Sequence, residues 1–234
     1  MKKVLVIGAN SGIGRAVCHR FTDADYNVYG TVRELSLSLE FTNGLFQLDL
    51  ADTDSFDRFC EDIESVGAFD VVIFNAGIID PQPFGEHESI NIDSMFCVNT
   101  LSPLKLLNKL VKASLIQESG KVVFIGSIAS VVSKPTSVGY SASKSALVGA
   151  IKALSLSLAE RFILVNMVSP GPTKTAMLDK NLTPQQQQEI INTIPLKRLA
   201  RPEEVAQAVY FIGSEMNTYI TGQNIILDGG FTSR

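Results

Sequence analysis

Three side chains near the middle of the sequence have the types and spacing needed for acid–base chemistry on a carbonyl group. Tyr140 and Lys144 are four residues apart in the stretch Ser-Val-Gly-Tyr-Ser-Ala-Ser-Lys, where an apolar helical pattern begins. Residues i and i+4 share one helix face, so the ammonium should lie beside the phenol and lower its pKa toward neutrality. A phenol of that kind can act as a general acid or base.

Ser127 lies thirteen residues before Tyr140 and follows a short apolar run, Val122 to Ile125, that is typical of a buried strand. In a parallel sheet the carboxyl end of this strand faces the crevice in which ligands bind. The Ser127 hydroxyl can then donate a hydrogen bond to a carbonyl oxygen that Tyr140 protonates. Ser127, Tyr140 and Lys144 are therefore the predicted catalytic residues.

The first strand–helix junction has the composition of a phosphate-binding turn. The run Gly8-Ala-Asn10-Ser11-Gly12-Ile13-Gly14 follows an apolar strand and opens a helix. Glycines let the backbone approach a pyrophosphate, and the free N–H groups and dipole of a helix start favour an anion. The spacing is GxxxGxG rather than the more familiar GxGxxG. We predict that these turn residues bind a dinucleotide.

The end of the second predicted strand bears on the choice between NAD and NADP. A carboxylate there would bind the adenosine ribose diol and indicate NAD, but Val32 occupies the position and Arg33 follows it. A guanidinium suits a 2′-phosphate, so the sequence predicts a preference for NADP(H). The alternative is that Arg33 is an ordinary solvated charge, and NAD(H) stays possible.

The elements that position these residues alternate between strand and helix. This alternation predicts βαβ units and one α/β domain over residues 1–234, with a parallel sheet covered by helices on both faces. The predicted strands are Lys3–Ile7, Asn27–Thr31, Leu45–Asp49, Val71–Asn75, Lys121–Ile125, Leu164–Ser169 and Asn224–Leu227. The predicted helices are Ile13–Ala24, Thr53–Val66, Ile92–Ala113, Tyr140–Phe162 and Glu203–Ser214.

The segment Pro170–Leu196 interrupts the alternation, because it begins with prolines and a glycine and contains four consecutive glutamines. An insertion of this length is usually a loop with short helices and often a lid, so we predict a substrate lid at about 172–196. A solvated surface excursion is the alternative.

Composition excludes several classes of function. The net charge of −4 and the pI near 5.3 argue against nucleic-acid binding, and no apolar run is long enough for a membrane span. His19 and His87 have no partner at metal-ligand spacing, so no metal is expected. The odd number of cysteines, Cys18, Cys60 and Cys97, predicts free thiols in a reducing cytoplasm.

With these residues in place, the sequence resembles the short-chain dehydrogenases/reductases over essentially its whole length, and is most similar to 3-oxoacyl-carrier-protein reductase-like ketoreductases. The resemblance implies a doubly wound, seven-stranded, Rossmann-like sheet and hydride transfer between a nicotinamide and a carbonyl or secondary alcohol carbon. The motifs occur in family order: GANSGIG (8–14), LDL (48–50), NAG (75–77), VNT around Asn99, Ser127, YSASK (140–144), NMVSPGPTKT (166–175) and TGQNIILDGG (221–230).

The resemblance also implies roles for single residues. Asn99 joins Ser127, Tyr140 and Lys144 in a catalytic tetrad, where it bends its helix around a water that links Lys144 to solvent. Tyr140 and Lys144 also contact the cofactor, Lys144 through the nicotinamide ribose. Asp49 would accept a hydrogen bond from the adenine amino group, with the Leu50 backbone nearby. The remaining implied contacts are Asn75, Ala76 and Gly77 on the adenosine ribose side, and Pro170, Gly171, Thr173 and Thr175 around the carboxamide and pyrophosphate.

The sequence departs from the family pattern at three positions. Ile7 stands where a threonine is usual, Phe74 where an asparagine is usual, and Ser11 where many NADP-preferring members carry a basic residue. The first two remove polar ties between strands and should affect stability more than chemistry. The third leaves Arg33 as the main candidate for 2′-phosphate binding.

The leading prediction is an NADP(H)-preferring carbonyl reductase or alcohol dehydrogenase that acts on a small molecule and is located in the cytoplasm. A sensor or scaffold that binds NAD(P) without turnover is the rival, and an NAD-dependent alcohol dehydrogenase of the same family is a further alternative. A nucleotide-sugar epimerase or dehydratase fits the chain length poorly. The substrate pocket is expected from Ile128, Ala129, the 78–83 loop and the insertion.

A homo-oligomer, either a dimer or a tetramer, is expected from the apolar surfaces of the long helices. The family usually pairs protomers through the helices that correspond to 92–113 and 140–162, and through the C-terminal strand. Apolar residues that lie outside the core face of the second helix are Ala146, Val148, Ala150, Ala153 and Leu156. Helices that are apolar all round require burial on both sides.

Overall fold

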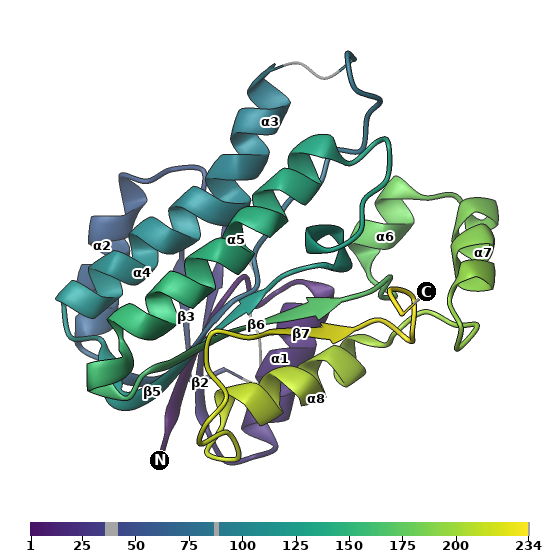
Figure 1. Cartoon of the computed structure of the whole chain (residues 1–234). Helices are drawn as coiled ribbons and strands as arrows, with labels where there is room; N and C mark the ends of the chain where they lie inside the picture. Colours follow the sequence, from purple (N-terminus) through teal and green to yellow (C-terminus); the bar gives the residue numbers. More distant parts are fainter. Residues whose placement is uncertain (36–41, 87–88, 234) are drawn as a thin grey trace.

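Seven parallel strands form the centre of the protein in the computed structural model, which describes residues 1–35, 42–86 and 89–233 (Figure 1). Their order is β3-β2-β1-β4-β5-β6-β7, so the chain winds outward in both directions from β1 and β4. Ligands of open α/β sheets bind beyond the carboxyl ends of the strands at such a reversal. The strands are β1 (Lys3–Ile7), β2 (Asn27–Val32), β3 (Gly44–Gln47), β4 (Phe69–Phe74), β5 (Ile116–Ile125), β6 (Leu164–Pro170) and β7 (Asn224–Leu227).

The predicted fold class is confirmed, and all seven predicted strands are present, β1 and β7 with the predicted bounds and the other five with shifted ends. β5 begins at Ile116 rather than at Lys121, because Ile116 pairs with Phe69 of β4 and the polar residues 117–120 bulge before the pairing resumes at Lys121. β3 ends at Gln47, so Asp49 lies in the following turn instead of in the strand. These shifts leave the carboxyl ends of the strands beside the predicted site residues.

Each face of the sheet packs against its own helices. Successive residues of a strand point to opposite faces, and Leu5 and Ile7 of β1 pack in one apolar core while Val4 and Val6 pack in the other. The first core lies under α2, α4 and α5, and the second lies under α1 and α8 (Figure 1). The bounds are α1 (Gly12–Thr22), α2 (Ser55–Glu64), α4 (Ser102–Lys112), α5 (Val138–Ser157) and α8 (Pro202–Gly213).

The helix predicted over Ile92–Ala113 is interrupted by a wider turn, in agreement with the bend at Asn99 that the family resemblance implies. The chain forms α3 (Ser89–Phe96), a π-helical turn η1 (Cys97–Leu101) and then α4. Asn99 lies in the middle of this π-turn. The helix predicted over Tyr140–Phe162 is α5 followed by the short 3₁₀ turn η3 (Ala159–Arg161), and a second 3₁₀ turn, η2 (Ile128–Ser130), follows Ser127.

The insertion after β6 contains two short helices, α6 (Ala176–Asn181) and α7 (Pro184–Thr193). Thr183 begins α7 with a capping box: its hydroxyl accepts from the Gln186 N–H, and the Gln186 side chain accepts from the Thr183 N–H. The insertion therefore contains short helices, as expected, and the consecutive glutamines belong to the second of them.

The cysteines are free thiols, as predicted: Cys18 and Cys60 are buried and Cys97 is partly buried. Burial raises the pKa of Cys18 to about 12. Within the described ranges no helix has the length and apolarity that crossing a bilayer requires. The same ranges contain no group of three His, Cys, Asp or Glu side chains that could hold a metal, and His87 lies outside them.

Candidate active site

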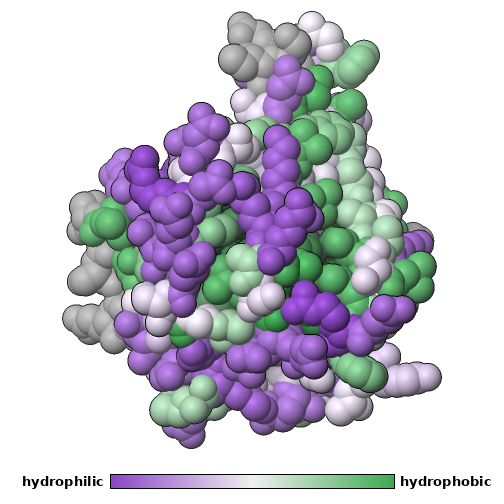
Figure 2. All heavy atoms as spheres, turned by 90° about the vertical axis from the view of Figure 1, so that its left-hand side faces the viewer, coloured by the Kyte–Doolittle hydropathy of each residue, from purple (hydrophilic) through white to green (hydrophobic). Residues whose placement is uncertain are grey.

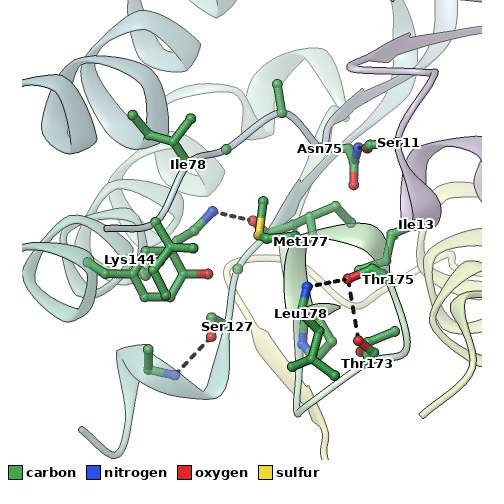
Figure 3. A pocket seen from close by; sticks show the side chains of 18 of the residues that line it. Ser11, Ile13, Asn75, Ile78, Ser127, Lys144, Thr173, Thr175, Met177 and Leu178 are labelled. Atoms are coloured by element: carbon green, nitrogen blue, oxygen red, sulfur yellow. Dashed lines mark hydrogen bonds between the residues drawn. The ribbon is translucent and has the colours of Figure 1, made fainter. Parts of the chain in front are cut away.

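A cavity of about 850 Å³ lies at the carboxyl ends of the strands and contains nearly all of the predicted site residues. Figure 3 shows Ser127 and Lys144 on one side of it, with Thr175, Met177 and Leu178 opposite. The two predicted residues that do not line the cavity are Gly14 and Asn99. The predicted residues that do line it are Gly8, Asn10, Ser11, Gly12, Ile13, Arg33, Asp49, Leu50, Asn75, Ala76, Gly77, Ser127, Tyr140, Lys144, Pro170, Gly171, Thr173 and Thr175.

The glycine turn is built from contacts that leave no room for side chains. Gly8 has a φ of +87°, in the left-handed region that glycine favours. A Cβ on Gly14 would come within 2.1 Å of the Gly8 carbonyl oxygen, so Gly14 acts by close packing rather than by contact with a ligand. Asn75 Nδ2 donates to the Gly8 carbonyl oxygen at 2.8 Å and to Ser11 Oγ at 3.0 Å. The turn is therefore held rigidly at the start of α1.

The start of α1 fits a pyrophosphate. Ser11 is the residue that precedes the helix, but its side chain accepts no hydrogen bond from the first helical turn. The early N–H groups of a helix have no partner within the helix, and they carry its positive end. Because these groups lie at the cavity, the turn can bind an anionic group there.

Ser127, Tyr140 and Lys144 converge as the sequence predicts. Ser127 follows β5, and its Oγ accepts from the Ala129 N–H at 3.1 Å, which fixes the hydroxyl at the start of η2. Lys144 Nζ lies 5.9 Å from the centre of the Tyr140 ring, and donates to the Ile125 carbonyl oxygen at 2.9 Å. The three functional groups thus lie at the carboxyl end of β5.

The expected lowering of the Tyr140 pKa is wrong for this structure. Burial raises the pKa of the phenol, and a hydrogen bond with Ser127 offsets only part of the increase. Burial also lowers the pKa of Lys144 to about 8. The ammonium is directed toward a backbone carbonyl, so the dominant influence on the phenol is desolvation rather than the neighbouring charge.

Asn99 is buried next to the site and holds two of its segments together. Its side chain is buried, accepts from the Ile78 N–H at 2.8 Å, and donates to the Ile78 carbonyl oxygen at 2.9 Å and to Ser143 Oγ at 3.1 Å. A Cβ on Gly77 would lie 3.1 Å from Asn99 Oδ1 and 3.4 Å from Lys144 Nζ. Asn99 therefore ties the loop after β4 to α5, next to the lysine. Sequence reasoning missed Ser143, although it lies inside the YSASK motif.

The segment after β6 closes the opposite wall. Thr173 Oγ1 donates to the Gly171 carbonyl oxygen at 2.9 Å, and Thr175 begins α6 by accepting from the Leu178 N–H. A Cβ on Gly12 would come within 2.8 Å of Thr175 Cγ2. The segment from Gly171 to Thr175 thus packs directly against the glycine turn.

Comparisons with known proteins identify this arrangement. A family model described as Enoyl-(Acyl carrier protein) reductase matches residues 8–232. A short chain dehydrogenase family protein from Francisella tularensis subsp. tularensis SCHU S4 has a solved structure with 27% identity and a TM-score of 0.91, and the match covers 100% of both chains. The chain belongs to the short-chain dehydrogenase/reductase family.

Similar proteins include a named reductase and a protein whose structure contains NADP. The chain is 34% identical over 236 residues to the 3-oxoacyl-[acyl-carrier-protein] reductase FabG of Buchnera aphidicola subsp. Schizaphis graminum, and the match covers 98% of this chain and 96% of that protein. It is 29% identical to ElxO, whose structure was solved with NADP bound, with a TM-score of 0.88 and coverage of 100% and 99%.

The departures from the short-chain dehydrogenase/reductase pattern are accommodated by other contacts. Thr31 Oγ1 accepts from the Gly8 N–H at 3.0 Å, so a hydroxyl from the neighbouring strand ties down the glycine turn. Phe74 stacks on Phe124 of β5 with ring centres 4.8 Å apart, next to buried Ile7. Thr31 was not predicted, since only the pairing of β1 with β2 brings it beside Gly8.

The β2–β3 end of the cavity carries Arg33 and Asp49. Val32 is buried and Arg33 is exposed. Within the described part of the chain the Arg33 guanidinium has no partner. One Asp49 oxygen accepts from the Ala51 N–H at 2.9 Å. The Leu50 carbonyl oxygen accepts from Ser102 Oγ at 2.5 Å, which fixes this turn to the start of α4. Arg33 and Asp49 therefore both line this end of the cavity, and among the described residues they form no ion pair with each other.

Proposed function

We propose that the protein is an NADP(H)-preferring reductase of ketones or aldehydes, and in the reverse direction a dehydrogenase of secondary alcohols. The observation that carries the proposal is the convergence of Ser127, Tyr140 and Lys144 on the cavity that also contains the glycine turn. The Buchnera relative's name, a 3-oxoacyl reductase, supports carbonyl reduction, and the NADP in ElxO supports the cofactor.

The residues divide the work between binding and proton transfer. The glycine turn would hold the pyrophosphate of the cofactor, and Tyr140 and the segment Gly171–Thr175 would hold its nicotinamide, which would supply the hydride. Ser127 donates a hydrogen bond to the substrate oxygen, which polarises the carbonyl. Tyr140 transfers its phenolic proton to the same oxygen as the alcohol forms. Lys144 stabilises the resulting phenolate and passes a proton back to it. Asn99 holds Lys144 and the loop at Ile78 in place.

The same geometry indicates how substrates enter. α6 and α7 contribute Met177, Leu178 and Ile190 to the cavity, and the loop after β4 contributes Ile78. These side chains are apolar, and both α6 and α7 are short. Both features are typical of a lid that covers a reacting group. In this proposal the insertion at about 172–196 excludes water once substrate is bound.

The test is turnover of a carbonyl panel with a matched tyrosine variant. We expect NADPH to be oxidised by the wild-type protein with at least one ketone or aldehyde, and Tyr140→Phe to lose about 10²–10⁴-fold in kcat, because proton transfer by a positioned side chain contributes that much. Tyr140→Phe should still bind NADPH, as measured by fluorescence titration.

Two outcomes would count against the proposal. A Tyr140→Phe protein that retains a tenth of the wild-type kcat would remove Tyr140 as the proton donor. Binding of NADPH by the wild-type protein without turnover on any carbonyl would favour the sensor or scaffold instead.

A further inference from the structure

The charged side chains that line the cavity are distributed unevenly along it. Of the described residues in its lining, only Asp49 is acidic, and it lies with Arg33 after β3 and β2. Ser127 follows β5, which is four strands from β3 in the sheet order. At the usual strand spacing of about 4.8 Å, roughly 19 Å separates the two ends. At the Ser127 end the charged lining consists of Lys144 and Lys134.

Lys134 is the cation at this end that the proton-transfer step does not use. Lys144 Nζ is buried and bonded to the Ile125 carbonyl oxygen, whereas Lys134 is exposed in the loop between η2 and α5. Its backbone carbonyl accepts from the Ser137 N–H at 3.0 Å and turns the chain into α5. Within the described residues its ammonium has no carboxylate partner. A cavity-lining cation without a counter-charge is available to a ligand.

Ser137 provides a second and independent group. It precedes α5, lines the cavity and is only 9% exposed, yet its hydroxyl caps no helix N–H and has no partner among the described residues. Since this hydroxyl lies at the cavity and no described group bonds to it, it can form a hydrogen bond with a ligand. The N-terminus of α5, which carries the positive end of the helix dipole, begins at the next residue. The hydroxyl, the helix start and Lys134 all favour an anion at the same place.

The position of Ser137 relative to Tyr140 limits the size of the ligand. The two residues are three apart, so they lie on one side of the helix start and about 4.5 Å apart along its axis. An anion held at Ser137 is thus a few bonds from a carbonyl held at Tyr140. The surrounding lining includes Val132, Met177 and Leu178, which suit a short apolar body.

From this geometry we infer that the substrate is an oxo acid. Its carboxylate is bound by Lys134 and Ser137 at the start of α5, and its ketone lies between Ser127 and Tyr140. The inference rests on the proposed reductase function and adds a substrate class to it.

The experiment compares acids with their own neutral esters. The probes are 3-oxobutanoate and 4-oxopentanoate, each paired with its methyl ester, reduced with NADPH at fixed ionic strength. We expect wild-type kcat/KM to be about ten-fold or more higher for the better acid than for its ester, since a charge-assisted hydrogen bond is worth about 1.5–3 kcal/mol. Lys134→Met should remove about ten-fold from the acid and leave the ester unchanged.

Two further variants complete the experiment. Ser137→Ala should raise KM for the acid several-fold and leave KM for the ester unchanged. Lys112→Met, an exposed lysine at the far end of α4, should change neither substrate. Equal efficiency with acid and ester in the wild type, or an equal loss on both in Lys134→Met, would overturn the oxo-acid inference while the reductase function stands. Failure of the wild type to reduce any acid, ester or other carbonyl would overturn the reductase function itself.

Discussion

Lys144 is a buried cation, and its ionisation is coupled to the stability of the fold. Burial lowers its pKa from 10.5 to about 8, so between these pH values the unfolded chain binds more protons than the folded one. The free energy of unfolding therefore rises with pH between about 8 and 10.5. Below this window the destabilising contribution of the buried Lys144 ammonium is fully present. The difference between the two pKa values corresponds to a change of about 3 kcal/mol in the free energy of unfolding.

The variant Lys144→Met should remove this pH dependence. We expect the free energy of unfolding of the wild type, relative to that of Lys144→Met, to increase by about 2–3 kcal/mol between pH 7 and pH 10. Urea unfolding of the cofactor-free proteins across this range measures it, with Lys112→Met as the exposed control. A difference that stays constant with pH would show that Lys144 keeps its ordinary pKa in the folded protein.

Arg33 decides cofactor choice in our proposal, because the neighbouring Val32 offers no carboxylate to a ribose diol. We expect wild-type kcat/KM to favour NADPH over NADH by about ten-fold or more, from one charge-assisted contact of about 1.5–3 kcal/mol. The double change Val32→Asp with Arg33→Ala should reverse the preference. The preference should also weaken as salt is added, since the site is open to solvent.

Steady-state kinetics with both cofactors measures this preference. Arg58→Ala, which removes an exposed guanidinium on α2, is the matched control and should leave the ratio unchanged. Equal efficiency with NADPH and NADH in the wild type would make Arg33 an ordinary surface charge.

At the scale of elements, the C-terminal turn links β7 to the insertion. The two Asp228 carboxylate oxygens accept from the Gly230 and Thr232 N–H groups at 2.8 and 2.7 Å. Gly229 and Gly230 have positive φ and pack against Ile194 and Pro195, where the insertion ends. The turn also brings Phe231 into the cavity lining.

Phe231 should therefore form part of the wall against which substrate binds. We expect Phe231→Ala to raise KM for a carbonyl substrate by about ten-fold, which corresponds to about 1.4 kcal/mol, because covering apolar area of a phenyl ring with a ligand stabilises binding by roughly this amount. Binding of NADPH should change little. Kinetics beside a fluorescence titration tests this, with Tyr219→Ala as an exposed aromatic control. An unchanged KM would place Phe231 outside the substrate wall.

The sequence predicts those elements whose signal is local, and misses those that depend on tertiary contacts. The glycine turn, the buried strands and the Tyr140–Lys144 pair follow from spacing alone. The π-turn at Cys97–Leu101 does not, since its residues keep an ordinary helical pattern and the widening coincides with the bonds from Asn99 to the 78 loop and α5. The pKa of Tyr140 was predicted in the wrong direction because burial cannot be read from an i, i+4 spacing.

Helix α7 is one of the short helices expected in the insertion, and a local signal marks its start, although its bounds were not predicted. Thr183-Pro184-Gln185-Gln186 has the sequence of a capping box with proline in the first helical position. The four glutamines continue the helix that this box begins.

At the scale of the whole molecule, α5 has an apolar surface on both sides. Its inner face packs on the sheet through Leu147 and Ile151, while Leu156 on the outer face is 80% exposed. Figure 2 shows polar side chains over much of the face that carries α2 and α4, and more hydrophobic surface toward the edge on which α5 lies. At one edge of the sheet, β7 has no partner strand on its outer side among the described residues.

These surfaces lead us to expect a dimer or tetramer in solution. An exposed apolar helix face and an open strand edge are both costly in water, and pairing two copies through α5 covers the helix face on each. A charge placed in that interface would be desolvated without a partner, so Leu156→Asp should lower the molar mass measured by light scattering to that of a smaller assembly or a monomer. Leu35→Asp, at an exposed position beyond β2, should leave the mass unchanged. A wild-type monomer at micromolar concentration would contradict the expectation, and the exposed face of α5 would then belong to a solvated helix.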